Sequence, residues 1–243
     1  MTATEKKRAT ISNRIDELDW PAIESSLWRY GYAQTGAILS QEECAVLDSL
    51  YEDESRFRKR VDMAAHNFGI GEYKYFEYPL PAEVTELRSA LFGHLARIAS
   101  KLEQALGQPI TYPDRLEQFL DECHKSGQTR PTPLLLRYNE GGYNCLHQDL
   151  YGEIWFPLQI TAFLSKPAVD FDGGEFMLVE QRPRAQSIGE ALQPVQGALV
   201  IFTTRYRPIK GTRGYYRANV RHGVSRIRRG KRSTLGIIFH DAK

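Results

Sequence analysis

Apolar residues recur at intervals of three and four in the first half of the chain. The clearest run spans residues 84–106 and stops at Gly107, which predicts a long amphipathic helix. A serine followed three residues later by a glutamate opens the run 40–51, and this capping-box pattern predicts a second helix. A shorter helix is expected from Asp114, which also has a glutamate three residues further on.

After Pro133 the pattern changes to short β-type runs separated by turn residues. Eight such runs at near-regular spacing, with no helical pattern between them, indicate an antiparallel double sheet or jelly roll. The runs are 134–139, 145–150, 156–165, 175–181, 186–192, 197–203, 217–227 and 232–240. We therefore expect an α+β fold, in which a helical support region (1–132) packs on a β core (133–243) as one integrated domain. The aromatic segment 69–81 is expected to form a hairpin or covering loop.

Composition narrows the class of protein. With 243 residues and 42% hydrophobic content, the chain can bury a full core without disulfides. Charged residues interrupt every apolar stretch, so neither a membrane span nor a secretion signal is expected. Three widely spaced cysteines favour reduced thiols. These features predict a cytoplasmic protein with no membrane partner.

Charge is distributed very unevenly along the chain. Residues 203–243 hold twelve Lys or Arg and a single acid, a net charge of +11, whereas the whole chain carries only +2. The remaining residues therefore carry −9, and the molecule is strongly polarised. Such a basic end requires either an anionic partner or a neighbouring acidic face.

Two histidines and an aspartate form a candidate metal site. His147 and Asp149 are two residues apart within a predicted strand, so both side chains leave the same face. His222 lies on a late predicted strand. Two imidazoles and one carboxylate are the ligand set that holds non-haem Fe(II) and leaves coordination positions open. The alternative is that His147 is a half-buried histidine hydrogen-bonded to Asp149.

Arg232 follows His222 by ten residues. The intervening residues 228–231 predict a turn, so that the two flanking strands pair as a hairpin and return the arginine to the metal. Thr234 falls on the same face as Arg232. A guanidinium with a hydroxyl beside it suits a buried carboxylate. The alternative is accidental placement, because this end of the chain is rich in arginine.

Four ordered blocks resemble the Fe(II)- and 2-oxoglutarate-dependent oxygenases, particularly the prolyl-hydroxylase-like branch. They are RYNEGGYNCLHQD (137–149), GGEF (173–176), QGALVIF (196–202) and the segment 221–239. The resemblance covers about 110 C-terminal residues. The segment 31–44 is also similar to the lead-in strand and first helix of that branch. The full chain is similar to a bacterial group predicted to act on nucleic acids.

The resemblance implies a double-stranded β-helix, a dioxygenase activity and a need for Fe(II), 2-oxoglutarate and O2. It implies that His147, Asp149 and His222 are the metal ligands. It implies that Arg232 binds the far carboxylate of 2-oxoglutarate, with the hydroxyl of Thr234 beside it, and that Tyr138 lies near the co-substrate.

Three further features bear on the resemblance. Gly173 and Gly174 fit the family's tight hairpin, at a φ that glycine adopts most easily. Phe163 stands where some members carry a tyrosine hydroxyl for the same carboxylate. A basic excursion over 204–219 precedes His222.

The basic region 203–232 suggests the substrate. Its arginines are interleaved with aromatic residues, a combination that contacts phosphates and stacks on bases in single-strand binders. We therefore expect hydroxylation or dealkylation of a nucleic-acid base, as in DNA repair. The residues expected to contact it are Arg205, Arg207, Arg213, Tyr215, Tyr216 and Arg217.

Three alternatives remain open. The arginines can pair with the acidic remainder of the molecule or of a dimer mate. The enzyme can instead hydroxylate a protein side chain such as proline, with Tyr73, Tyr75 and Phe76 guiding the peptide, although such aromatics are more often core. The chain can also be a non-enzymatic nucleic-acid-binding module with structural histidines.

Overall fold

The computed structural model describes residues 10–149 and 152–243. Leu150, the last residue of the predicted strand 145–150, lies outside the described residues, as do residues 1–9 of the predicted support region. The helices are α1 (Ile11–Asp16), α2 (Trp20–Tyr30), α3 (Gln41–Ser49), α4 (Ala82–Ala105) and α5 (Leu116–Lys125), with short 3-10 turns at Leu50–Glu52, Glu54–Arg56 and Ala64–His66.

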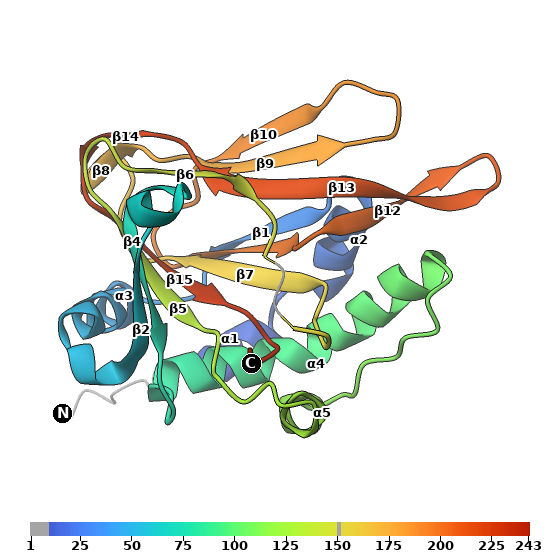
Figure 1. Ribbon diagram of the computed structural model, residues 1–243, viewed down its shortest axis with the longest axis horizontal. Coiled ribbons are helices and arrows are strands. Elements are labelled where there is room, and N and C mark those ends of the chain that lie inside the picture. Colours follow the sequence, from blue (N-terminus) through green and yellow to red (C-terminus); the bar gives the residue numbers. More distant parts are fainter. Residues whose placement is uncertain (1–9, 150–151) are drawn as a thin grey trace, which may run out of the picture.

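Two facing antiparallel sheets form the centre of the molecule (Figure 1). The seven-stranded sheet has the order β1 (Tyr32–Ala37), β11 (Ala198–Thr203), β7 (Leu158–Phe163), β15 (Arg232–Ile237), β5 (Leu134–Tyr138), β4 (Glu72–Phe76) and β2 (Phe57–Asp62). The six-stranded sheet has the order β10 (Ile188–Leu192), β9 (Phe176–Gln181), β13 (Gly214–Val224), β6 (Tyr143–His147) and β3 (Gly69–Ile70), with β12 (Tyr206–Gly211) paired to β13. A small third sheet joins β14 (Ile227–Gly230) to β8 (Phe171–Gly173).

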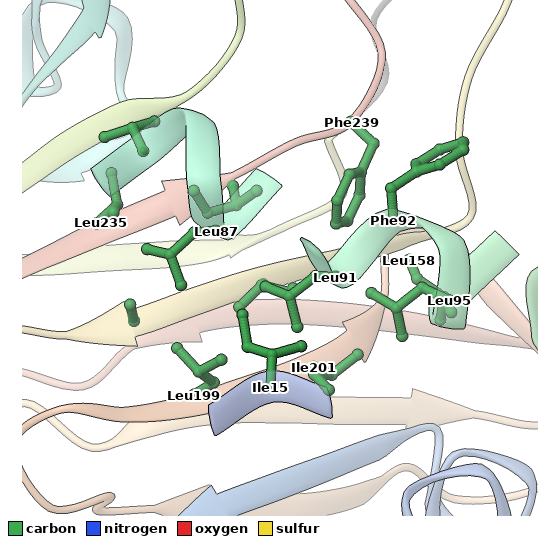
Figure 2. Close-up of a cluster of buried hydrophobic side chains, with 14 of the residues drawn as sticks. Ile15, Leu87, Leu91, Phe92, Leu95, Leu158, Leu199, Ile201, Leu235 and Phe239 are labelled. Carbon is green, nitrogen blue, oxygen red and sulfur yellow. The ribbon is translucent and has the colours of Figure 1, made fainter. Parts of the chain in front are cut away.

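The main core lies between α4 and the seven-stranded sheet. Apolar side chains spaced by three and four along α4, including Leu87, Leu91 and Leu95, are fully buried. Figure 2 shows them facing Leu199 and Leu235, which project from β11 and β15. Burying a stripe of this kind is the main stabilising term for an amphipathic helix. The helix therefore holds the outer face of the sheet and leaves its inner face for the site.

The predicted helices are present, with one correction at a helix start. Ser40 and Glu43 make the reciprocal capping-box hydrogen bonds of α3. In contrast, α5 begins at Leu116, and its cap residue Arg115 makes no side-chain capping bond. Asp114 therefore lies one residue too early to cap this helix.

The first 132 residues also supply strands to both sheets. The segment 69–81, expected as a hairpin or covering loop, contributes β4, which pairs with β2 on one side and β5 on the other. The exposed edge thereby moves from β5 to β2. Residues predicted as helical support thus extend the two main sheets.

The predicted hairpin between the strands carrying His222 and Arg232 is wrong. β13 pairs with β6 and β9 in one sheet, whereas β15 pairs with β5 and β7 in the other. The intervening β14 pairs with β8 and carries the chain across. His222 and Arg232 consequently project into the interior from opposite sheets. Within the described residues, no helix is long and apolar enough to cross a membrane.

Candidate active site

The structure brings His147, Asp149 and His222 together. One ligand atom from each residue can be chosen so that all three lie within 4.8 Å of one another. Asp149 Oδ1 lies 3.4 Å from Nε2 of His147, and Asp149 Oδ2 lies 3.3 Å from Nε2 of His222. Strand β6 ends at His147, so Asp149 reaches the site from the following loop rather than from a strand.

Hydrogen bonds and burial define the state of this triad. Nδ1 of His147 lies 2.7 Å from the carbonyl oxygen of Cys145, so the proton belongs on Nδ1 and the lone pair of Nε2 points to the other two residues. Burial lowers the pKa of this imidazole, but Asp149 outweighs it and leaves the pKa raised. Burial and the charge of His147 lower the pKa of His222. A carboxylate beside two donor nitrogens fits a divalent metal.

Gln159 supports the triad and was not predicted. It lies on β7 in the facing sheet, and its Nε2 donates to Asp149 Oδ2 at 2.8 Å. Burial alone raises the pKa of Asp149, but the two imidazoles hold that pKa well below 3.8. The available signal was a single amide in the otherwise apolar and hydroxyl-bearing run LQITAF, since a buried polar group requires partners.

The triad opens into a cavity of about 460 Å³ between the two sheets, which we call the triad cavity. Arg232 lines this cavity and is only 1% exposed. Its Nε and Nη2 atoms are buried without a hydrogen-bond partner among the described residues. Burial lowers the pKa of this guanidinium to about 10, which leaves it charged at neutral pH. An unpaired buried cation beside a cavity fits an anionic ligand.

Other predicted residues surround Arg232. Thr234 and Tyr138 both line the triad cavity, and Tyr138 lies opposite Arg232 in the β15–β5 register. Burial raises the pKa of Tyr138 to about 12, so the phenol keeps its proton. The ring of Phe163, where a tyrosine was considered, lies 5.2 Å from the Arg232 guanidinium carbon. It supplies a cation–π contact and no hydrogen bond.

The two predicted glycines adopt left-handed backbone conformations. Gly173 has φ +75° and Gly174 has φ +63°, where a residue with a Cβ is strained. A Cβ on Gly174 would lie 2.9 Å from Cδ of Arg232. The glycine therefore allows the chain to pass close to the arginine stem.

The aromatic segment on β4 divides between the two sides of the sheet. Tyr73 and Tyr75 line the triad cavity, whereas Phe76 is fully buried in the main core. This split follows from strand alternation. Two tyrosines on β4 thus form part of the cavity wall.

The basic residues predicted to contact substrate lie outside the triad cavity. Arg205, Arg213, Tyr215, Tyr216 and Arg217 are exposed, and none of them lines that cavity. Most of the excursion 204–219 forms the β12–β13 hairpin.

Arg207 is the exception within this set because it is 5% exposed. It is paired with Glu180, and its Nη1 donates to the carbonyl oxygen of Trp28 at 2.9 Å. The internal ion-pair alternative therefore holds for Arg207. Its charge is not directed at solvent.

Comparisons with known proteins agree with this geometry. Residues 71–242 match a family of oxygenases described as catalysing oxidative methylation of damaged DNA. Two uncharacterized proteins of Mycobacterium tuberculosis, Rv2227 of strain H37Rv and MT2286 of strain CDC 1551, are each 50% identical to this chain over 167 residues. That alignment covers 69% of this chain and 72% of each relative.

Solved structures share the fold at low sequence identity. A prolyl-4-hydroxylase from Pseudomonas putida is 15% identical with a TM-score of 0.53, covering 92% of this chain and 99% of its own. A 2OG-Fe(II) oxygenase family oxidoreductase from Burkholderia pseudomallei is 16% identical with a TM-score of 0.53, covering 93% and 94%. A Trichoplax adhaerens prolyl hydroxylase is 13% identical with a TM-score of 0.56, covering 91% and 89%. The predicted jelly-roll fold is confirmed.

Proposed function

Because this chain belongs to the oxygenase family that its residues 71–242 match, we propose that it uses Fe(II), 2-oxoglutarate and O2 to hydroxylate or dealkylate a nucleic-acid base. The family description names damaged DNA, which supports a role in nucleic-acid modification and repair. The proposal keeps the cytoplasmic location expected from the sequence. The membership argues against the non-enzymatic module. The observation that most supports this proposal is that the triad and the unpaired, buried guanidinium of Arg232 line the same cavity.

The donor set fits the proposed metal. His147, Asp149 and His222 would hold Fe(II), since two neutral imidazoles and one carboxylate suit this ion and leave positions open. Gln159 would orient the carboxylate through its 2.8 Å hydrogen bond. When bound, Fe(II) with 2-oxoglutarate and O2 supplies the oxidising power for attack on a C–H bond.

The remaining residues bind and shield. Arg232 would take the far carboxylate of 2-oxoglutarate, because its unpaired Nε and Nη2 face no other acceptor among the described residues. Thr234 adds a hydroxyl beside it. Tyr73 and Tyr75 offer an aromatic wall on which a flipped base can stack. Arg232 and His222 are buried between the sheets, so this part of the cavity is shielded from bulk water.

Mass spectrometry tests this function. The protein is incubated with Fe(II), 2-oxoglutarate and ascorbate together with either methylated oligonucleotides or proline-containing peptides. We expect succinate formation coupled to a mass change in the oligonucleotide. His147→Ala should abolish both signals, whereas His94→Ala is a matched control, since His94 stacks on Trp20 among the helices.

Two results would contradict the proposal. A mass change confined to the peptides would identify a protein side-chain hydroxylase instead. Succinate formation that persists in iron-reloaded His147→Ala would remove the triad from the mechanism.

A further inference from the structure

We propose that a second groove, between the C-terminal part of α2 and the β12–β13 hairpin, binds a single strand of nucleic acid. We call it the α2–β12 groove. Its lining includes Trp28, Arg29, Arg182, Arg207, Lys210 and Tyr215. The inference rests on the proposed function for the nature of the ligand, and it adds a place where the strand is held.

The triad cavity is poorly suited to phosphates. Among its described lining residues the only lysine or arginine is Arg232, which is buried and reserved for the co-substrate in the proposed function. Neutralising phosphates provides most of the non-specific affinity for nucleic acid. A strand whose base enters this cavity therefore needs cationic contacts elsewhere.

The α2–β12 groove concentrates positive charge. Four cations line a space of about 610 Å³, and the one carboxylate bound to them is Glu180, which pairs with Arg182 and Arg207. Arg29 and Lys210 are exposed and form no ion pair with any described residue. The groove thus keeps a net charge of about +3 with its bound acid included, and two of its cations face solvent.

Aromatic rings lie among these cations. Trp28 and Tyr215 approach each other with ring centroids 5.7 Å apart at a tilt of 54°. Tyr215 is 43% exposed, and Tyr30, beside Arg29, is 47% exposed. Stacking on exposed rings holds bases without sequence preference. Cations next to such rings favour a single strand, whose bases are accessible, over a duplex.

Arg207 holds the two walls of the groove together. Its guanidinium joins the Trp28 carbonyl on α2 to Glu180 on β9. Gly31 ends α2 with φ +79°, and a Cβ there would lie 2.7 Å from Cδ of Arg207. This glycine permits the close approach of helix and hairpin. The groove is therefore built into the fold before any ligand binds.

The groove and the triad lie at different points of the same strand. Tyr215 precedes His222 by seven residues on β13, which corresponds to about 23 Å at ~3.3 Å per residue. That span equals roughly seven stacked nucleotides at ~3.4 Å each. A strand held in the groove must extend several nucleotides to place a base at the triad.

Binding of a fluorescent single-stranded 12-mer, followed by anisotropy at several salt concentrations, tests the groove. Arg29→Ala/Lys210→Ala should weaken binding about 10-fold or more. It should also reduce the slope of log K against log salt by about 1.4, at ~0.7 for each phosphate. Tyr215→Ala should weaken binding about fivefold. Lys125→Ala/Lys166→Ala, which removes two exposed cations outside the groove, is the matched control and should bind like the wild type.

Circular dichroism first establishes that each variant has the wild-type melting temperature. Unchanged affinity and salt slope in Arg29→Ala/Lys210→Ala would overturn the groove, as would a mononucleotide or a duplex binding as tightly as the 12-mer. Succinate formation is measured separately, so the two proposals can fail separately. Groove-dependent binding without turnover would reject only the proposed function, and turnover on oligonucleotides without groove dependence would reject only the groove.

Discussion

Two clusters in this fold contain the same residue types, an arginine, a carboxylate and histidine, yet differ in how fully their hydrogen bonds are made. One is the triad cavity with Arg232. The other, which we call the Arg88 cluster, comprises Arg88, Asp241, Tyr78 and His124 under α4.

Arg88 has a hydrogen-bond partner for each of its three side-chain nitrogens, and Nη1 donates to the Tyr78 hydroxyl at 3.1 Å. It donates from Nε to the Ile238 carbonyl at 3.1 Å, and from Nη2 to the Phe239 carbonyl at 2.7 Å and Asp241 at 2.8 Å. Arg232 instead leaves Nε and Nη2 unpaired beside a cavity. Both guanidiniums are 1% exposed. Burial therefore does not distinguish these two arginines, whereas the unmade hydrogen bonds of Arg232 do, as its proposed role in binding a ligand requires.

The largest expected difference concerns activity. His147→Ala should reduce succinate formation by more than about 100-fold, since even residues that only support metal ligands affect activity by 10–100-fold. Its free energy of unfolding should change by less than about 1 kcal/mol, because His147 is partly exposed at the cavity. Turnover assays and urea denaturation measure the two quantities. If His147→Ala remained active, or if it unfolded, the triad cavity would no longer differ in role from the Arg88 cluster.

Asp241→Asn should have the opposite profile. It leaves Arg88 buried without its charged partner, and breaking such a pair destabilises a protein by about 3–5 kcal/mol. Below the unfolding transition the activity of the folded protein should persist. Urea denaturation gives the stability, and an unchanged midpoint would contradict the structural role.

The Arg88 cluster should also make stability depend on pH through its neighbour His240. Burial, with the nearby charge of Arg88, lowers the pKa of His240 to about 4 in the folded state, against about 6.5 when unfolded. The unfolded state then binds more protons between these values, so stability falls as pH drops from 6.5 towards 4, by about 3 kcal/mol in all.

His240→Asn should flatten this pH dependence relative to the wild type, because it removes the titrating imidazole. The asparagine side chain keeps an acceptor for the Phe156 N–H, whose nitrogen lies 3.2 Å from Nδ1 of His240. Denaturation midpoints measured at several pH values test it. Parallel curves for the two proteins would refute the assignment.

Arg232→Met should have the smallest effect, and this effect should be on the 2-oxoglutarate requirement. Loss of a charge-assisted hydrogen bond of about 1.5–3 kcal/mol corresponds to a 10- to 150-fold higher 2-oxoglutarate requirement. Stability without ligand should hold or rise, because an unpaired buried charge is removed. Titrations of 2-oxoglutarate and urea report the two effects. A strong loss of stability with unchanged 2-oxoglutarate dependence would make Arg232 equivalent to Arg88.

Sequence patterns predicted the fold where periodicity decides it. The 84–106 helix appears because it buries one stripe, and a strand occurs within each of the eight β runs, although β6 ends at His147 within the run 145–150. The convergence of His147, Asp149 and His222 was also foreseen. The structure places Arg232 across the interior rather than in a hairpin, since pairing of β14 with β8 is a long-range choice with little local signal.

The burial of individual charged side chains was the hardest feature to predict from the sequence. Arg207 was grouped with exposed arginines, but Glu180 on another strand makes it internal. Gln159 was overlooked because its partner Asp149 is close only after the sheets pack. A linear pattern records periodicity, whereas these partnerships depend on which strands become neighbours.

Anaerobic calorimetric titration of Fe(II) into wild-type protein, His147→Ala and Asp149→Ala tests whether the triad is the metal site. We expect one ion bound per chain in the wild type, and binding weakened beyond detection in both variants, while the control His94→Ala binds like the wild type. Equal binding of one ion by the wild type and by both triad variants would contradict it.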